Sequence, residues 1–345
     1  LSVLKYSQTT ISNCIFNNIS KIKSPDYVRS IHYLDNYKML MLFQFATVTF
    51  KNTIIENYSH LMSVISSTLE IISSVIKNPN VYLNERQLMS TFESTVYLTD
   101  LTLIDELSSI SIKTVTDKWI TSFASTLYAR ALIVKDLIDD VGKFGEFYGG
   151  YYNFTDSIFS NVSYKVSGSI FEQVEGSLIY FSNVTFNQTG SLFKLQLIDE
   201  IYLSIQVQSD KKMDFLISIV DSSAVSIINT TINITQADTL PIKSKAIIYI
   251  EETQPNILLE NVAIRNSFTS MGAIYFALQK KLSSVSISNS YFENNNVMGK
   301  NGAVINIDLT SSSNYTISNC VFKRNQALLN PSELTGGRGG AIYRS

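Results

Sequence analysis

The chain has 345 residues, of which 45% are apolar and only 16% carry a charge. Its 27 basic and 29 acidic residues nearly cancel, and it lacks the basic cluster that binding to nucleic acid or to an anionic membrane surface requires. The polar share is mostly Ser, Thr and Asn, which favours strands and turns, and the apolar stretch around residues 39–45 is far too short to span a bilayer.

A short pattern recurs along the chain. Residues 11–16, 287–292 and 317–322 all read Ile-Ser-Asn-x-x-Phe, and we name the last position the anchor. The predicted anchors are Phe16, Phe50, Ile76, Leu103, Phe159, Phe186, Val207, Ile232, Ile264, Phe292 and Phe322. One more copy is expected between Leu103 and Phe159. This gives about 12 copies of about 28 residues, a spacing typical of solenoids.

The positions around each anchor predict two short strands joined by a bend. The residue five before the anchor is apolar, the residue three before is Asn, Asp, Ser or Thr, and the residue two before is mostly small. In one straight strand the first of these and the anchor would face opposite sides. The polar residue between them resolves this, because Asn and Asp tolerate left-handed conformations. Two short strands facing one core form a coil of a parallel β-helix, for which a right-handed crossover is expected.

The pattern weakens within residues 59–150. A helical stripe is conceivable there, at Leu61, Ile65, Leu69, Ile72 and Ile76, with a looser one at Trp119, Phe123 and Leu127. Because Ile76 and Leu103 keep the repeat pattern, we favour degenerate coils with longer loops over an irregular or helical insertion. The fold class expected is therefore all-β, with residues 1–345 forming one continuous segment of a right-handed parallel β-helix.

A second signature, Gly-Ala followed by an aliphatic residue, begins at Gly272, Gly302 and Gly340. Glycine there suits a corner with positive φ that leads into the next strand. Because the last copy opens a new strand, we expect the segment to belong to a longer chain. Its C-terminal edge would be continued by further coils or by a neighbouring subunit in a filament.

The two signatures together resemble those of a known family. Gly339-Gly340-Ala341-Ile342, Phe292-Glu-Asn-Asn295 and Phe322-Lys-Arg-Asn325 resemble the repeats of chlamydial-type polymorphic outer membrane proteins, which also occur in large surface proteins of ciliates and other protists. The clear motifs cover residues 257–345. The resemblance implies a pectin-lyase-like β-helix, surface exposure and an adhesive or structural role, and it brings no catalytic residue.

Residue patterns for enzyme chemistry are sparse. His32 and His60 are the only histidines, and neither has metal-site or triad spacing. Polysaccharide-cleaving β-helices stack carboxylates on successive coils, but the outward position four before the anchor holds one acid, Glu260. The pairs Asp139-Asp140, Asp199-Glu200 and Asp210 with Asp214 fall in predicted loops. We expect no catalytic, cofactor-binding or metal-binding residue, and no enzyme.

The outward position one before the anchor carries no charge in any copy. Strand propensity alone explains such a column, and a flat face that meets a partner or a second copy is the alternative. Cys14 and Cys320 occupy the same small-residue position, about eleven coils apart. They should therefore be free thiols, because a disulfide needs Cα atoms within about 7 Å.

Glycosylation is expected if the chain is secreted. The candidate N-glycosylation sites are Asn18, Asn57, Asn153, Asn161, Asn187, Asn233 and Asn314. Asn183 and Asn229 also begin sequons, but they stand at the corner position and are expected to turn inward.

The expected function is a structural or adhesive scaffold or stalk at the cell surface or outside the cell, as part of a filament or coat. Its partners would be further coils of the same polypeptide, other copies of itself, glycans or surface proteins, with no nucleic acid and no membrane insertion. The alternative is a carbohydrate-binding or carbohydrate-cleaving β-helix, which two carboxylates on adjacent coils would favour.

Overall fold

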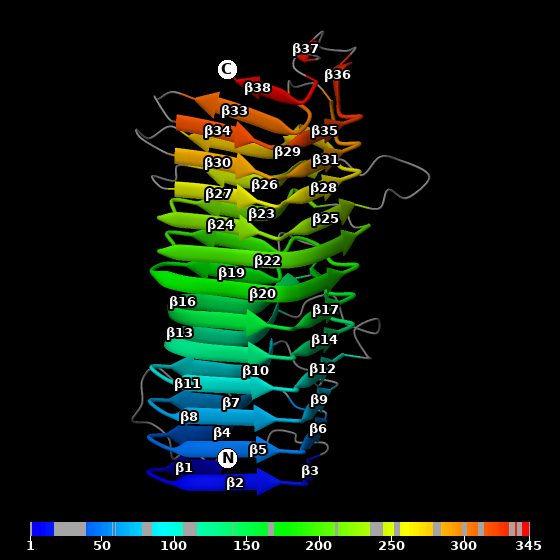
Figure 1. Cartoon of the computed structure of the whole chain (residues 1–345). Helices are drawn as coiled ribbons and strands as arrows, with labels where there is room; N and C mark the ends of the chain where they lie inside the picture. The colour runs from blue at the N-terminus through cyan, green and yellow to red at the C-terminus, as the bar shows by residue number, and fades with distance from the viewer. Residues whose placement is uncertain are drawn as a thin grey trace.

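The structure is a computed structural model that describes residues 2–16, 39–56, 58, 60–77, 85–105, 116–139, 141–164, 169–210, 213–234, 244–251, 256–278, 284–298, 302–309, 314–330, 335–336 and 340–344. Within these residues it is all-β and contains no helix. Nearly all strands belong to one large sheet whose pairings are parallel, in agreement with a β-helix or solenoid. The strands stack from the N-terminus at the bottom of Figure 1 to the C-terminus at the top.

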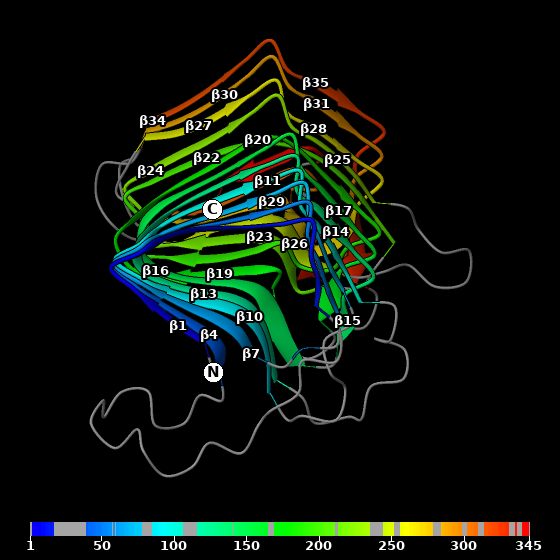
Figure 2. The ribbon, with the colours of Figure 1, turned by 90° about the horizontal axis from the view of Figure 1, so that it is seen from below.

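The stack consists of three ladders of paired strands, which lie on different sides when it is seen from one end (Figure 2). Ladder A contains β1 (Ser2–Lys5), β4 (Met39–Gln44), β7 (His60–Ile65), β10 (Glu85–Phe92), the first parts of β13 (Thr116–Arg130) and β16 (Val141–Thr155), β19 (Phe171–Val174), β21 (Phe193–Gln196), β23 (Phe215–Val220), β26 (Ser244–Glu251), β29 (Phe268–Leu278), β33 (Ile305–Leu309) and β38 (Ile342–Arg344).

Ladder B follows ladder A in each repeat. It contains β2 (Gln8–Ser12), β5 (Thr47–Lys51), β8 (Thr68–Ile72), β11 (Thr95–Thr99), the second parts of β13 and β16, the first parts of β20 (Ser177–Asn187) and β22 (Glu200–Ser209), β24 (Ala224–Ile228), β27 (Asn256–Glu260), β30 (Ser284–Ser288) and β34 (Asn314–Ser318).

Ladder C carries the anchors. It contains β3 (Ile15–Phe16), β6 (Ile54–Glu56), β9 (Val75–Lys77), β12 (Thr102–Ile104), β14 (Ile133–Lys135), β17 (Ile158–Ser160), the second parts of β20 and β22, β25 (Thr231–Ile234), β28 (Ala263–Arg265), β31 (Tyr291–Glu293) and β35 (Val321–Lys323). The shorter strands β15 (Ile138–Asp139), β18 (Ser163–Tyr164), β32 (Asn296–Met298), β36 (Gln326–Asn330) and β37 (Thr335–Gly336) lie outside the three ladders, and β36 pairs with β37 antiparallel.

The predicted anchors stack in register along ladder C, with one correction. The observed row is Phe16, Ile55, Ile76, Leu103, Val134, Phe159, Phe186, Val207, Ile232, Ile264, Phe292 and Phe322. All are buried except Phe16 and Phe322, which are partly buried against the same core. The prediction of Phe50 as an anchor is wrong, because Phe50 pairs with Ile11 in ladder B. Val134 supplies the copy that was expected between Leu103 and Phe159.

The corner position has the left-handed backbone that the sequence predicted. The residues between ladders B and C with φ of 46° to 55° are Asn13, Asn52, Ser73, Asp100, Ala131, Asp156, Asn183, Asn229, Asn261, Asn289 and Asn319. Short polar side chains prevail there because they tolerate this conformation best after glycine. The copy that ends at Val207 differs, since β22 continues through this position and the register shifts beside Asn183. That copy therefore lacks the bend residue.

Asparagine side chains join neighbouring corners. Asn261 donates its Nδ2 to Oδ1 of Asn229 at 2.8 Å, and Asn183 donates likewise to Asp156 at 2.8 Å. A second row lies after the anchors, where Asn294 donates to Asn266 at 2.9 Å. These bonds connect successive rungs of the stack through side chains as well as through the backbone.

Small hydroxyl residues satisfy backbone groups inside the stack. The Oγ of Ser74 accepts a hydrogen bond from the amide of Thr53 at 3.1 Å and donates to the carbonyl of Ile72 at 2.8 Å. The Oγ of Ser290 likewise accepts a hydrogen bond from the amide of Val262 and donates one to the carbonyl of Ser288. This explains the preference for small residues two before the anchor, because the backbone amide that follows each bend is buried and needs a hydrogen-bond acceptor.

Residues 59–150 contain no helix in their described part. Strands β7 to β16 cover it, and the apparent helical stripe divides between buried Leu61, Leu69 and Ile76 and half-buried Ile65 and Ile72. Strands β13 and β16 each run through 15 residues, across the corner between ladders A and B, where Ala124 and Gly149 have positive φ.

Glycine is required at two of the late corners. Gly272 has φ of +115° and Gly302 has φ of +69°, as the Gly-Ala signature predicted. A Cβ at Gly272 would stand 2.8 Å from the carbonyl oxygen of Gly302, and one at Gly302 would stand 2.5 Å from that of Ile305. Any other residue would clash with backbone atoms at these points.

Candidate functional site

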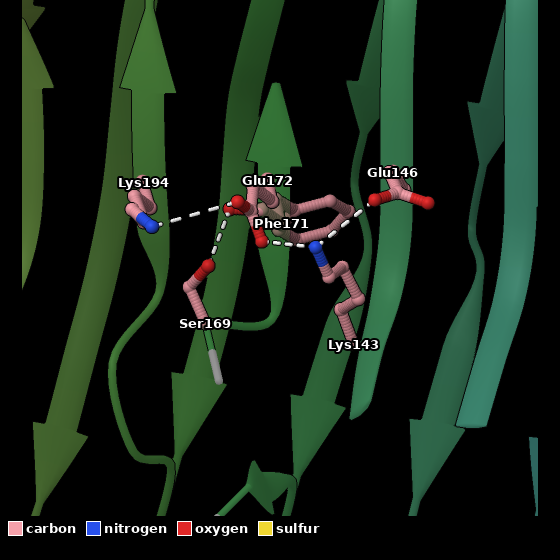
Figure 3. A network of polar contacts seen from close by, with 6 residues as sticks. All are labelled: Lys143, Glu146, Ser169, Phe171, Glu172 and Lys194. Carbon is pink, nitrogen blue, oxygen red and sulfur yellow. Dashed lines mark hydrogen bonds and ion pairs between the residues drawn. The ribbon is translucent and has the colours of Figure 1, made fainter. Parts of the chain in front are cut away.

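Two carboxylates lie in register on adjacent strands of ladder A. Glu146 of β16 is the register partner of Glu172 of β19. The Nζ of Lys143 lies 3.0 Å from Oε1 of Glu146 and also forms a close hydrogen bond to Oε2 of Glu172. Lys194 of β21, on the next rung, lies 3.6 Å from Oε1 of Glu172 (Figure 3). We name these four residues the charge cluster.

Burial and pairing set the electrostatics of the charge cluster. Glu146 is only 6% exposed. Burial disfavours the ammonium of Lys143, but its hydrogen bonds to Glu172 and Glu146 outweigh this effect and raise the pKa of Lys143 above its ordinary value. Burial, reinforced by the negative charge of Glu146, raises the pKa of Tyr148 to about 12. At neutral pH Lys143 is therefore an ammonium group, and Tyr148, which lies beside the charge cluster, is a neutral phenol.

The arrangement is suited to joining rungs. Like charges directly opposite one another on neighbouring strands are destabilising, and Lys143 relieves this by bonding to both carboxylates. General acid and base catalysis needs carboxyls that can exchange protons with a substrate. A substrate here would first have to displace Lys143. The sequence prediction missed Glu146 and Glu172, since it followed an outward position of ladder B, although their separation is close to one repeat.

A row of tyrosines lies on the outward side of ladder B. Ring centroids are 5.2 Å apart for Tyr97 and Tyr128, 5.5 Å for Tyr128 and Tyr151, 5.4 Å for Tyr151 and Tyr180, and 6.2 Å for Tyr180 and Tyr202. The rings of Tyr97 and Tyr128 are nearly parallel, at 7°. Their faces therefore cover one another, and the ring edges and hydroxyl groups remain for contact with other molecules.

The predicted acidic residues are dispersed. Glu260 is the only acid in its outward row, which reads Ser12, Lys51, Ile72, Thr99, Arg130, Thr155, Ser182, Ser204, Ile228, Glu260, Ser288 and Ser318. Asp214 pairs with Lys245 at 3.2 Å. In the described part of the chain no three His, Cys, Asp or Glu residues gather as metal ligands would. His32 and Asp140 lie outside the described residues.

The uncharged column is an outward row of ladder C. It reads Ile15, Ile54, Val75, Thr102, Ile133, Ile158, Thr185, Gln206, Thr231, Ala263, Tyr291 and Val321, and every member is half-buried or exposed. The adjoining outward row is charged towards both ends, where it contains the ion pairs of Lys77 with Glu56 at 2.9 Å and of Lys323 with Glu293 at 3.1 Å. Between them it holds the uncharged residues Ser160, Asn187, Gln208 and Asn233, so the uncharged strip is two side chains wide over those rungs.

The sequons differ in their surroundings. Asn187 and Asn314 are exposed, while Asn153, Asn161 and Asn233 are half-buried and hydrogen-bonded to Tyr151, Asp136 and Asn266. Asn18 and Asn57 lie outside the described residues. The prediction that Asn183 and Asn229 turn inward is wrong. Both are exposed, because the left-handed bend points its side chain away from the core.

Both cysteines are free, as predicted, and half-buried. The Sγ of Cys14 donates to the carbonyl of Ser12 at 3.3 Å, and that of Cys320 to the carbonyl of Ser318 at 3.2 Å. They lie near opposite ends of the described stack and act as small polar residues of the bend.

Comparisons with known proteins place the chain in no family. No family model, no curated protein and no solved structure matches it. Across the described residues, no helix has the length and hydrophobicity to span a bilayer.

Proposed function

We propose that the chain is a right-handed parallel β-helix of about twelve coils and that it serves as a structural or adhesive scaffold at the cell surface or outside the cell. The observation that carries this proposal is the continuous buried core, which extends from Met41 to Ile307 through every rung between them. Each rung contributes to it and depends on its neighbours, as in solenoids whose stability is collective.

The engagement of polar side chains supports the same function. The corner asparagines bond to one another, the inner serines bond to the backbone of the bends, and the charge cluster joins the rungs of Glu146, Glu172 and Lys194. Functional groups that an enzyme would direct at a substrate are used here within the stack. A rod of this kind suits a stalk or a coat.

Solution scattering and protease digestion test the scaffold. Twelve rungs at about 4.8 Å give roughly 55 Å of stacked strands, so the monomer should scatter as a prolate particle and resist proteases within the strands of the three ladders. A globular scattering profile, or rapid cleavage throughout the ladders, would refute it.

A second function is favoured by one observation, the register pairing of Glu146 with Glu172. Two carboxylates on adjacent rungs are the arrangement expected of a carbohydrate-binding or carbohydrate-cleaving β-helix. The test is release of sugar ends from a panel of polysaccharides by the wild type and by Glu146→Gln and Glu172→Gln. Glu260→Gln, which removes an isolated outward acid, is the matched control. Turnover that both cluster variants lose and the control keeps would replace the scaffold with the enzyme.

A further inference from the structure

Five tyrosines lie on consecutive rungs of ladder B, and we name them the tyrosine row: Tyr97 of β11, Tyr128 of β13, Tyr151 of β16, Tyr180 of β20 and Tyr202 of β22. Each ring centroid lies 5.2 to 6.2 Å from that of the ring on the next rung. Phenylalanine would serve stacking equally well, and it occupies other exposed positions at Phe45, Phe92 and Phe123. The row therefore places phenol groups, and not only aromatic rings, side by side.

The pair of Tyr97 and Tyr128 is the most exposed part of the row. The two residues are direct register partners, and their rings stack at 5.2 Å and 7°. Tyr97 is 38% exposed and Tyr128 is 37% exposed, whereas the other three members of the row are half-buried. A dissolved oxidant can therefore reach both phenols of one stacked pair.

Other tyrosines of the described residues lack one of these two properties. Tyr6 is 73% exposed, but its ring stacks on that of Phe45 and not on another tyrosine. Tyr249 and Tyr275 stack on each other at 5.8 Å, but both are half-buried. Exposure and a stacked tyrosine neighbour coincide at Tyr97 and Tyr128.

We propose that Tyr97 and Tyr128 form an oxidative cross-linking site, where a haem peroxidase with hydrogen peroxide joins two rungs through dityrosine. Each phenol loses one electron and its proton. The two phenoxyl radicals form a carbon–carbon bond between the ring positions ortho to their hydroxyls, and the two ortho hydrogens move to the phenolic oxygens. One hydrogen peroxide takes up the two electrons and two protons and becomes two waters, so the chain loses two hydrogen atoms.

The register favours coupling within one chain. Strand pairing holds the two rings beside each other before oxidation, so the effective concentration of the neighbouring phenol far exceeds that of a second chain. Because more than a third of each side chain is exposed, the rings can tilt out of parallel to form the bond. The product closes a covalent loop that restricts the unfolded chain, as a disulfide does. The proposal goes beyond the scaffold function, since it needs only the register of ladder B.

Oxidation of the full chain at low micromolar concentration, by a haem peroxidase with limiting hydrogen peroxide, tests the site. Cys14 and Cys320 are first capped with a maleimide. The wild type should remain monomeric, lose the mass of two hydrogen atoms and gain dityrosine fluorescence. Digestion and mass spectrometry should find a joined peptide pair that contains Tyr97 and Tyr128. The midpoint of thermal unfolding should rise after oxidation, because the link restricts the unfolded chain.

Two variants separate proximity from exposure. The double variant Tyr97→Phe/Tyr128→Phe keeps both rings but lacks both phenols, and it should lower the dityrosine yield of the monomer by roughly fivefold or more. The matched control Tyr6→Phe removes a more exposed phenol that has no tyrosine neighbour, and it should react like the wild type.

Three results would overturn the inference: dityrosine formed only between chains, an oxidised monomer without the joined Tyr97 and Tyr128 peptides, or equal yields from the wild type and the double variant. Circular dichroism confirms that each variant is folded. Scattering of the unoxidised chain reports on the scaffold separately. An elongated monomer that forms no link would refute the cross-linking site alone, and a globular monomer would refute the scaffold.

Discussion

Phe171→Ala should destabilise the stack more than any single change at its surface. Phe171 is 1% exposed, and seven phenylalanine rings surround it with centroids 4.9 to 6.4 Å away. Truncation leaves a cavity of up to about 100 Å³, which at about 24 cal/mol per Å³ costs roughly 2.4 kcal/mol in addition to the lost transfer free energy. Because buried Phe→Ala changes cost about 3–5 kcal/mol, we expect a value near the upper end here.

Denaturant titration followed by circular dichroism measures this loss. Phe171→Leu, which keeps most of the side-chain volume, should cost about 1–2 kcal/mol. Leu197→Ala, at a residue that is 48% exposed, should cost about 0.5 kcal/mol or less.

Hydrogen exchange shows where the loss falls. Since each rung contacts its neighbours, protection should decrease in β16 to β21 and persist in β31 and β35. A loss under about 1.5 kcal/mol for Phe171→Ala, or a uniform decrease in protection, would refute the view that this ring cluster stabilises its own rungs.

The corner, a buried tyrosine and the thiols give further tests. Because Asn261 has φ of 53°, Asn261→Gly should change the free energy of unfolding little, whereas Asn261→Ala should lower it by about 1–2 kcal/mol. Equal losses for the two variants in denaturant titrations would contradict the requirement for a left-handed backbone at this bend. Burial raises the pKa of Tyr152 to about 12. Its contribution to stability is therefore complete below the ordinary pKa of about 10 and lost as the pH rises through 12. Tyr152→Phe should flatten this alkaline decline in unfolding free energy, and an unchanged slope would refute the assignment. Cys14 and Cys320 should both react with a maleimide without reduction, whereas a Cys14–Cys320 crosslink found by mass spectrometry would be incompatible with the ladders.

The sequence predicts the bends well where the chemistry of the bend is strict. Asn at the left-handed position recurs because few residues accept that backbone, so the copies around Asn261, Asn289 and Asn319 are recognisable without a structure. Ala131 takes the same conformation without a polar side chain, and the copy that ends at Val134 therefore had no visible bend. In the sequence, an apolar residue at the bend cannot be told from one within a strand.

Two other errors have physical causes. The second copy was misaligned because Phe50 lies five residues before Ile55, at the other apolar, inward-facing position of the pattern, and Thr47, three residues before Phe50, resembles the bend residue. The charge cluster was missed because it lies in ladder A, whose strands vary in length and spacing. Carboxylates that meet only when strands pair in register cannot be located until that register is known.

The asparagine rows have a direction. In each of the amide contacts Asn52 to Asn13, Asn183 to Asp156, Asn261 to Asn229 and Asn319 to Asn289, the residue later in the chain donates and the earlier one accepts. Aspartate is consequently admissible at a rung whose successor is an amide, as at Asp156, while two successive aspartates would repel each other. The residue type tolerated at one bend therefore depends on the residue at the bend of the following rung. In related sequences, substitutions at the bend positions of adjacent rungs should accordingly occur together.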